Sequence, residues 1–348
     1  MGSVVERPQT TYLTSAMTHF STIEVAYSMK RLDTEDAQDL HKQRQAMYEA
    51  ADRYRQSFID SHTKLIHSKY TEWRNCPVCD SGRHRSLFNK NGGQYVICNE
   101  CEMIFLNPVL KDLELAEYYK NNNEIQSSAH ENESAFYRRI YSAGLDMIAT
   151  VKAKGSLLDI GCSGGFFLDI AKERGFVTHG VELNKAEVRI ASSKGHVVWG
   201  VPIQQTPDSQ SFDVITLWDV FEHIKNGISY LTHLRSRLAV GGLLFLQIPS
   251  ANSLAARIIR EKCNVFDGVE HVNLYSSNTL ERIANASGFK IVSIKSVIDE
   301  LKPVLNYLNY DDPYTGAFAE NRSFEFLTPE LIHEKLLGYK LQVVLIPV

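Results

Sequence analysis

Hydrophobic residues in the second half of the chain fall into short runs, and segments with helical spacing separate the first several of them. Five such runs lie at 156–160, 178–183, 196–201, 212–218 and 243–249. Strands that alternate with helices in this way are typical of a parallel sheet with helices on both faces. Two further strands are expected later, over 290–298 and 339–347. The pattern therefore predicts an α/β fold for this part of the chain.

The N-terminal part lacks this alternation of strands and helices. Residues 1–31 are polar and weakly patterned, which predicts a flexible tail. No Pro or Gly interrupts residues 33–70, and apolar residues recur there at steps of three and four, as on one face of a helix. A helical segment is therefore expected over 32–73. It is either one helix of about 57 Å, at 1.5 Å per residue, that joins copies into a homo-oligomer, or two helices broken near Ser61 that pack on their own domain.

Four of the six cysteines form two CxxC pairs, Cys76 with Cys79 and Cys98 with Cys101. Each pair places two thiolates on one tight turn, and two facing turns close a tetrahedral site of four sulfur ligands, which suits zinc. The alternatives are free thiols that cluster by accident or a redox pair. Because four thiolates leave no open position, the zinc is expected to be structural. It would supply the folding energy of a ribbon over 74–108, whose core is expected to be separate from that of the α/β part.

A glycine-rich turn follows the first strand of the α/β part, in the segment LLDIGCSGGFFL at 157–168. Such a turn brings backbone N–H groups and a helix N-terminus close to a ligand. It does not match the dinucleotide fingerprint GxGxxG, because Ser163 and Phe166 occupy two of the glycine positions. Asp159 suits a cationic amine, and Glu182 ends the next strand where a carboxylate binds ribose hydroxyls. Together these carboxylates indicate S-adenosylmethionine. The alternative is a strand-turn-helix without a ligand.

Several segments beyond this turn carry a family resemblance. LLDIGCSGGFFL, GVEL, FDVITLWDVFEHI, GGLLFLQIPS and HVNLYSSNTLERIANASGF resemble the class I S-adenosylmethionine-dependent methyltransferases, over residues 156–289. CPVC, VICNECEMIFLNP and ELAEYY resemble the zinc ribbon that precedes this domain in bacterial methyltransferases of polysaccharide, deoxysugar and natural-product pathways. The resemblance thus covers roughly 76–298. It departs from the family at Ser163, where the family usually has glycine.

The resemblance implies a fold and a set of cofactor contacts. The expected fold is a Rossmann-like sheet of seven strands in the order 3-2-1-4-5-7-6, with the last strand antiparallel. A helical segment, the zinc ribbon and a helical connector over 109–155 precede this domain, which would occupy 156–348. Cofactor contacts are implied for the glycine-rich loop and its neighbours: Asp159, Gly161, Cys162, Ser163, Gly165, Glu182 and Trp218.

Methyl transfer also requires that the acceptor be aligned and that it lose a proton. His271 follows the fifth strand on a segment expected over the methyl end of the cofactor. In the zinc-ribbon sugar methyltransferases that the chain resembles, a Glu-His pair in this region is associated with base catalysis. His271 is therefore the candidate general base, and Glu270 would orient its ring or carry a proton. His223 is a second candidate, which braces the site more often in the family.

Two alternatives to this assignment stay open. His271 could simply pack or bind substrate, which would leave alignment alone to drive the transfer. A metal ion could assist the reaction instead, with Asp219, Glu222 and Glu270 as its ligands.

The net charge of the chain helps to distinguish a small-molecule acceptor from a nucleic-acid acceptor. Lys and Arg number 37 against 41 Asp and Glu, for a net charge of −4. Phosphate contacts need Lys and Arg, so nucleic acid is an unlikely partner. The favoured function is methyl transfer to a small molecule, a sugar or saccharide or a natural-product intermediate. An RNA base methyltransferase is the alternative, supported only by Arg83, His84, Arg85 and Lys90. A further alternative is a cofactor-binding module without turnover.

Two further features bear on location and acceptor. No run approaches the roughly 20 apolar residues of a membrane span, and the first residues lack the apolar stretch of a secretory signal, so a cytoplasmic protein is expected. An insertion at 299–338 is rich in aromatic residues and Asn, which suits sugar binding. A packing flap or a dimer contact is the alternative for this insertion. The acceptor atom, oxygen, carbon or nitrogen, stays open.

Overall fold

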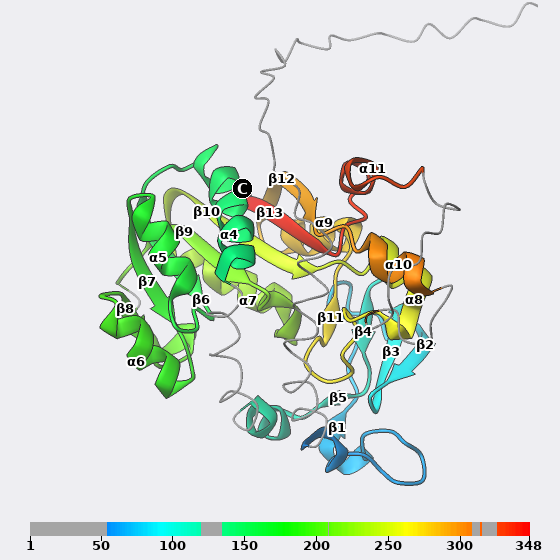
Figure 1. Ribbon diagram of the computed structural model, residues 1–348. Helices are drawn as coiled ribbons and strands as arrows, with labels where there is room; N and C mark the ends of the chain where they lie inside the picture. The colour runs from blue at the N-terminus through cyan, green and yellow to red at the C-terminus, as the bar shows by residue number, and fades with distance from the viewer. Residues whose placement is uncertain (1–53, 120–133, 208, 308–313, 315–325) are drawn as a thin grey trace, which may run out of the picture. The chain divides into compact units, whose positions relative to one another are not determined.

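A seven-stranded sheet organises the second half of the chain, in the order β12-β13-β10-β9-β6-β7-β8 (Figure 1). Its strands are β6 (Gly155–Ile160), β7 (Phe176–Val181), β8 (Val197–Trp199), β9 (Phe212–Trp218), β10 (Leu238–Pro249), β12 (Phe289–Val297) and β13 (Lys340–Pro347). The pairs from β8 to β10 are parallel, whereas β13 runs antiparallel to both β10 and β12. Counted along the chain, the order is 3-2-1-4-5-7-6, so the predicted α/β fold is confirmed.

The structure is a computed structural model that describes residues 54–119, 134–207, 209–307, 314 and 326–348. These residues all fall within one unit, Leu32–Val348. The predicted tail and most of the predicted N-terminal helix, with its role in oligomerisation, lie outside the described residues. None of the helices in the described ranges is long and apolar enough to cross a lipid bilayer.

The end of the predicted N-terminal helical segment is described. The chain breaks near Ser61, as one of the two alternatives expected, but the expectation of a second helix after this break is wrong. Residues 57–67 form turns, and only the short 3-10 helix η1 (Ser68–Tyr70) follows them. Asp60 accepts hydrogen bonds from the backbone N–H groups of His62 and Thr63, and Ile59 pairs with Ile66. These local bonds fold the chain back on itself, because an Asp side chain competes with the helical hydrogen-bond pattern.

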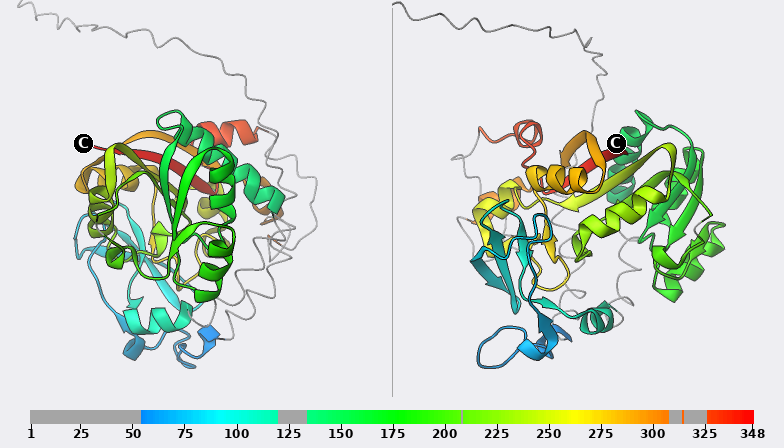
Figure 2. Two further views of the ribbon diagram at one scale, coloured as in Figure 1. Left: turned by 90° about the vertical axis from the view of Figure 1, so that its left-hand side faces the viewer. Right: turned by 180° about the vertical axis from the view of Figure 1, so that it is seen from behind.

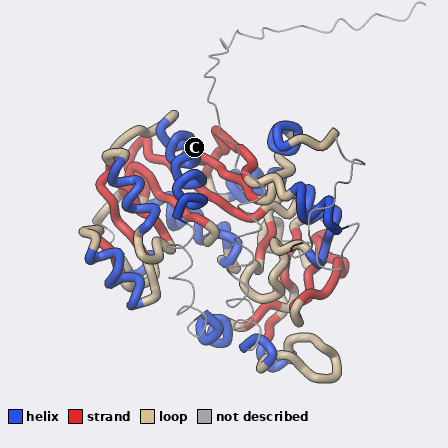
Figure 3. The backbone as a smooth tube through the Cα atoms, in the orientation of Figure 1, coloured by secondary structure: helices blue, strands red, loops and turns tan. Residues whose placement is uncertain are grey.

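Helices lie on both faces of the large sheet (Figures 2 and 3). Side chains of α4 (Ser134–Ala149) and α5 (Phe166–Glu173) pack on one face, and those of α7 (Gly227–Ser236) and α9 (Ser277–Ala286) on the other. The other helical segments are α6 (Lys185–Ser193), η2 (Ile203–Gln205), η3 (Phe221–His223), α8 (Leu254–Ile259), η4 (Arg260–Lys262), α10 (Leu301–Tyr307) and α11 (Pro329–Glu334). Residues 112–119 are also helical.

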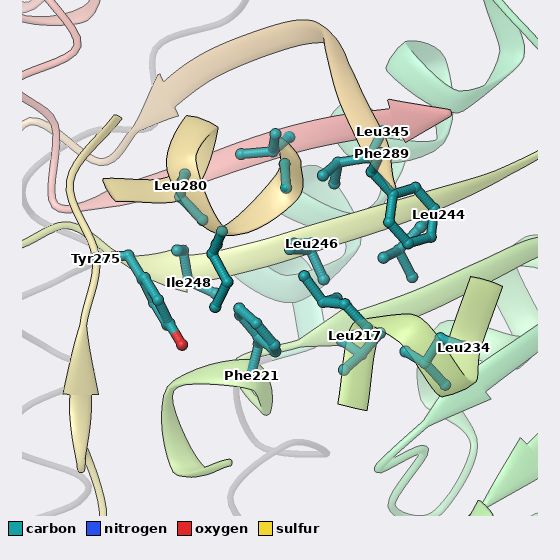
Figure 4. Packing of buried hydrophobic residues seen from close by; sticks show 14 of the residues in the cluster. Leu217, Phe221, Leu234, Leu244, Leu246, Ile248, Tyr275, Leu280, Phe289 and Leu345 are labelled. Atoms are coloured by element: carbon teal, nitrogen blue, oxygen red, sulfur yellow. The ribbon is translucent and has the colours of Figure 1, made fainter. Parts of the chain in front are cut away.

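Strand β10 shows how the sheet separates two cores. Successive residues of a strand point to opposite faces. Leu244 and Leu246 therefore lie in one core and Phe245 in the other. Figure 4 shows the first of these cores, where Leu246 lies close to Leu217 and Ile248 close to Tyr275. Burial on both faces explains why these strands read as continuous apolar runs.

The cysteine-rich segment forms a four-stranded sheet with the order β11-β4-β3-β2. Three strands come from this segment, β2 (His84–Lys90), β3 (Gly93–Cys98) and β4 (Ile104–Leu106), but β11 (Asn273–Leu274) belongs to the α/β part. A second, two-stranded sheet joins β1 (Thr71–Glu72) to β5 (Val109–Leu110). Cys76, Cys98 and Phe105 are buried in the same core as the large sheet. The expectation of a separate ribbon core is therefore wrong, because this small sheet is completed by a strand from elsewhere.

Candidate active site

The glycine-rich loop connects β6 to α5 at the carboxyl edge of the sheet. Gly161, Ser163 and Gly165 have positive φ angles of 77°, 47° and 82°. The backbone N–H groups of Gly161 and Cys162 donate to the carbonyl of Val181, at 2.8 and 3.1 Å, and this ties the loop to the end of β7. A Cβ on Gly161 would lie 2.7 Å from a methyl group of Val220. The sequence pattern thus gives the expected strand-turn-helix, with glycine where the backbone requires it.

Glu182 lies against this loop. Its carboxylate accepts hydrogen bonds from the backbone N–H of Ser163 at 2.9 Å and from that of Asn184 at 2.8 Å. The acidic residue that the sequence associates with a ribose is therefore held beside the glycine-rich turn. Ser163 also donates its hydroxyl to Glu187, a buried residue of α6. Sequence analysis missed Glu187, since nothing in its local pattern distinguishes it from a surface residue of a helix.

Asp159 lies within β6 and is buried, with its side chain directed at Thr216 of β9. The Thr216 hydroxyl donates to the carboxyl oxygen of Asp159 at 2.7 Å. Burial raises the pKa of Asp159 from 3.8 to about 8, against the lowering effect of this hydrogen bond, and the nearby charge of Glu182 raises it further. A carboxyl group in this state becomes ionised readily when a cation binds beside it.

Trp218 and Cys162, both predicted cofactor contacts, have side chains in the core. The ring of Trp218 packs against Tyr141 and Phe245, each with a centroid distance of 4.7 Å. Cys162 is buried, and a Cβ on Gly180 would meet its sulfur at 2.4 Å. Cys162 thus presents only its backbone to the loop. Trp218 lies at the end of β9, as expected.

Two of the predicted catalytic residues come together with Glu222. The Nε2 atoms of His223 and His271 lie 3.9 and 4.0 Å from Oε1 of Glu222. The two imidazole rings are 5.1 Å apart between centroids, at an angle of 82°. We call Glu222, His223 and His271 the histidine cluster. The sequence predicts Glu270 as a partner of His271, and the structure places a second carboxylate, that of Glu222, 4.0 Å from its Nε2.

The hydrogen bonds of the two imidazole rings show which nitrogen atom of each ring is left to face Glu222. Nδ1 of His271 lies 2.8 Å from the carbonyl of Val265. A carbonyl can only accept, so Nδ1 donates and Nε2 of the neutral ring carries the lone pair. Nδ1 of His223 bonds the hydroxyl of Tyr119 at 2.9 Å. Tyr119 is a member of the site that sequence analysis missed. In the sequence its segment, ELAEYY, carries only a family resemblance.

Burial sets the charge of the histidine cluster. It lowers the pKa of His223 to about 3, and the neighbouring His271 lowers it further, so His223 is neutral. Burial also raises the pKa of Glu222 well above its ordinary value, as does the nearby Asp219. Asp219 itself forms an ion pair with Lys340 of β13 and accepts from Gln247. His223 is therefore neutral, and Glu222 favours its protonated form unless a cation lies beside it.

Asp267 shapes the turn that carries His271. Its carboxylate accepts hydrogen bonds from the backbone N–H groups of Val269, Glu270 and His271, at 2.9 to 3.1 Å. The Tyr95 hydroxyl, from β3 of the ribbon, donates to the carbonyl of His271 at 3.3 Å. The cysteine-rich segment thus contributes directly to the position of the candidate base.

Arg74 joins the ribbon to both catalytic segments. Its guanidinium donates to the carbonyl of Val272 at 2.6 Å and to the side chain of Asn273 at 2.9 Å, next to His271. It also donates to the carbonyl of Lys225 at 3.1 Å, close behind His223. Burial lowers its pKa to about 10, so it stays charged at neutral pH. The sequence assigns no role to Arg74, because these three partners lie more than a hundred residues away along the chain.

The four predicted cysteine ligands also come together. The sulfur atoms of Cys76 and Cys101 are 3.4 Å apart and those of Cys79 and Cys98 are 3.5 Å apart. All four sulfur atoms lie within 4.8 Å of one another. Zinc–sulfur bonds of about 2.3 Å place tetrahedral sulfur ligands at separations of this order. The donor set and its geometry therefore fit zinc.

Residues 131–294 match the family model described as a methyltransferase domain. The ubiquinone biosynthesis O-methyltransferase of Paramagnetospirillum magneticum is 29% identical over 119 residues, which cover 31% of this chain and 47% of that protein. The enzyme of the same name from Aeromonas salmonicida is 28% identical over 110 residues, covering 28% and 45%. The chain thus spans about half the length of the curated relatives that it matches.

Solved structures give looser likenesses. A structure of the plantazolicin methyltransferase BpumL in complex with SAH covers 67% of this chain and 93% of that chain, at 18% identity and a TM-score of 0.46. A SAM-dependent methyltransferase from Archaeoglobus fulgidus covers 59% and 92%, at 19% identity and a TM-score of 0.42.

The family match includes the glycine-rich loop, Glu182 and all three residues of the histidine cluster, whereas the cysteine cluster lies outside it. Residues 131–294 are thus similar to a methyltransferase domain, and this match covers less than half of the chain.

Proposed function

We propose that this protein is an S-adenosylmethionine-dependent methyltransferase that acts on a small-molecule acceptor. One observation carries the proposal. The glycine-rich loop follows β6, and Glu222 and His223 of the histidine cluster follow β9, so both lie at the carboxyl ends of neighbouring parallel strands. In open α/β sheets this edge is where ligands bind. A cofactor site and a proton acceptor are thus adjacent within the matched domain.

The proposed cofactor contacts follow the charges of the loop. The ammonium group of the cofactor would lie beside Asp159, the backbone of Gly161, Cys162, Ser163 and Gly165 would surround its amino-acid end, and Glu182 would bind the ribose hydroxyls. Trp218 would border the cofactor from the end of β9. The bound cofactor supplies an electrophilic methyl group. The chain then has to align the acceptor and remove its proton.

His271 is the proposed general base. Its Nδ1 is committed to the carbonyl of Val265, so Nε2 is the atom that receives the proton. His223 and Tyr119 would hold the facing side of the site and offer a second proton acceptor. Glu270 would assist from the adjacent position, as the Glu-His pair suggests. Asp267 holds the turn and keeps His271 in position for this step.

A sugar or a natural-product intermediate is the proposed acceptor. The named relatives are O-methyltransferases of ubiquinone biosynthesis, which supports an oxygen acceptor on a small organic molecule. The RNA alternative has little support, because Arg83 of the ribbon is paired with Glu100 at 2.6 Å. We further propose that Cys76, Cys79, Cys98 and Cys101 hold one structural zinc ion.

Calorimetry with the purified protein tests the cofactor assignment. S-adenosylmethionine and its demethylated product are expected to bind, and NAD is not. Glu182→Ala removes the ribose acceptor and should weaken binding by about 1.5–3 kcal/mol, the value of a hydrogen bond to a charged group. Glu173→Ala, an exposed change outside the site, is the control and should leave binding unchanged. Binding of NAD in place of the methyl donor would contradict the proposal.

A further inference from the structure

We infer that the histidine cluster is also a binding site for a divalent transition-metal ion, separate from the cysteine cluster, and that this ion inhibits methyl transfer. The binding is argued from geometry, burial and charge, and does not depend on the proposed function. The inhibition rests on the proposed function, in which His271 needs its free Nε2 to accept a proton.

Glu222 is the first reason for this inference. Its side chain is 1% exposed, and neither of its carboxylate oxygens has a hydrogen-bond partner among the described residues. A buried carboxylate without a partner is unfavourable, so it must hold a proton or lie beside a cation. The cluster therefore has an unsatisfied ligand atom at its centre.

Both imidazoles direct a nitrogen atom toward this carboxylate. Their Nδ1 atoms are held by Val265 and Tyr119, and their Nε2 atoms lie 3.9 and 4.0 Å from Oε1 of Glu222. One ligand atom from each of the three residues lies within 4.8 Å of the others. Histidines that bind metals commonly engage their second ring nitrogen with a carbonyl or another oxygen in this way. The cluster thus resembles a prepared ligand set.

The surrounding charges and the donor types indicate which ion binds. Two more carboxylates face this region, Asp267 and Asp219, and the cationic Lys340 is already bound to Asp219. Lys340 offsets the charge of Asp219 and Arg55 that of Asp267, so the carboxylate of Glu222, unpartnered among the described residues, is the group left to attract a cation. Two imidazoles and one carboxylate suit Ni²⁺, Co²⁺ or Zn²⁺ better than Mg²⁺ or Ca²⁺, which prefer oxygen ligands. Both histidine side chains are 20% exposed, so an ion can reach them.

An ion at this site would remove the proton acceptor. Coordination uses the lone pair on Nε2 of His271, and the same lone pair would take the proton from the acceptor. The two events exclude each other at one nitrogen atom. The metal therefore competes with catalysis without displacing the cofactor, whose loop lies on β6 and α5.

Titration of the zinc-loaded, cofactor-free protein with Ni²⁺, followed by calorimetry, tests the site. One further equivalent should bind. Glu222→Gln and His271→Gln should each weaken this binding by more than about tenfold, and Tyr119→Phe by about tenfold, because it removes the support of His223. His62→Ala, which removes an exposed histidine elsewhere, is the matched control and should not change it. Thermal unfolding of each variant verifies that it is folded.

If no equivalent of Ni²⁺ binds to the zinc-loaded protein, or if wild type and the folded Glu222→Gln and His271→Gln variants bind it equally, the proposed site is overturned. The rate of methyl transfer should fall as Ni²⁺ fills the histidine cluster, while calorimetry should show that cofactor binding is unchanged. Stimulation by Ni²⁺ would overturn the inhibitory role, since His271 bound to the ion could not then be the base on which methyl transfer depends. Because Ni²⁺ binding is measured without cofactor, a failure of the methyltransferase proposal is seen separately, as an absence of S-adenosylmethionine binding.

Discussion

Ser163 illustrates how one side chain adapts the cofactor loop. The methyltransferase family that this loop resembles usually has glycine at this position. Ser163 adopts a positive φ of 47°, a conformation that glycine favours. Its hydroxyl donates to Glu187 of α6, and its backbone N–H donates to Glu182. The strain of this conformation is thus offset by two hydrogen bonds to acidic residues. The substitution ties the loop to α6 while leaving Glu182 in place.

His271 is the residue on which turnover should depend most. His271→Ala is expected to lower kcat by about 10²–10⁴-fold, the usual contribution of a positioned base. The Kd of S-adenosylmethionine should barely change, because the ring belongs to the acceptor side. Steady-state kinetics with a methylated product, together with calorimetry, measures both quantities. If kcat stays within a few-fold of wild type, the base is another group, and His223 is the next residue to test.

Asp159 should make cofactor binding release protons. In the free protein its pKa is about 8, so the carboxyl is mostly protonated at pH 7. An ammonium group beside it stabilises the ionised form, so its pKa falls on binding and a proton leaves. Calorimetry at pH 7 in buffers of different ionisation enthalpy should detect this release. Asp159→Asn should abolish it, and an unchanged release in that variant would assign the proton to another group.

The same carboxyl should influence stability in the cofactor-free protein. The unfolded chain loses this proton near pH 3.8, whereas the folded protein keeps it up to about pH 8. The unfolded state therefore binds fewer protons across this window, and the free energy of unfolding falls as pH rises through it. Denaturant titrations at pH 5 and pH 8 give the slope of the free energy of unfolding against pH, for wild type and for Asp159→Asn. A slope as steep in the variant as in the wild type would contradict this origin.

At the scale of elements, the ribbon and the catalytic segments are connected by Arg74. Its planar guanidinium reaches the segment after His271 and the segment after His223 at once. Arg74→Lys keeps the charge but loses this planar arrangement of donors. It should lower kcat by about 10–100-fold through misplacement of the two histidines, with the Kd of S-adenosylmethionine unchanged.

Two comparisons make this result specific to positioning. Arg83→Lys changes an exposed arginine of the same ribbon and should leave kcat at the wild-type value. The midpoint of thermal unfolding reports separately on stability. A variant at Arg74 that turns over like wild type while remaining folded would show that the ribbon does not position the site.

At the scale of the whole molecule, zinc should stabilise more than the ribbon. The cysteines share a hydrophobic core with the large sheet, and β11 completes the ribbon sheet. Chelation of the proposed zinc ion, or Cys98→Ser, should therefore lower the midpoint of a single unfolding transition and reduce methyl transfer together. Differential scanning calorimetry measures this. Two transitions, with the larger one unchanged, would indicate that the ribbon unfolds independently.

The strands and the turns between them follow from local pattern. All seven predicted strands of the large sheet appear near their expected positions. The inner strands β6, β9, β10 and β13 carry apolar runs that are buried on both faces, whereas β8 and β12 at the edges are partly exposed. The wrong element is the helix expected to reach Tyr70. Its periodic apolar residues were present, but Asp60 and the Ile59–Ile66 pair close a turn there. A side chain that bonds its own backbone changes the local structure without altering the apolar spacing.

The sequence by itself determined the α/β fold, the glycine-rich loop with Glu182, and the two cysteine pairs. Each of these depends on residues close together in the chain or on strand ends that a parallel sheet brings to one edge. Only the tertiary structure decided that Glu222 faces His271, that Tyr119 supports His223, and that Arg74 joins the ribbon to both. These contacts join separate segments, and their geometry depends on side-chain packing, which no local pattern records.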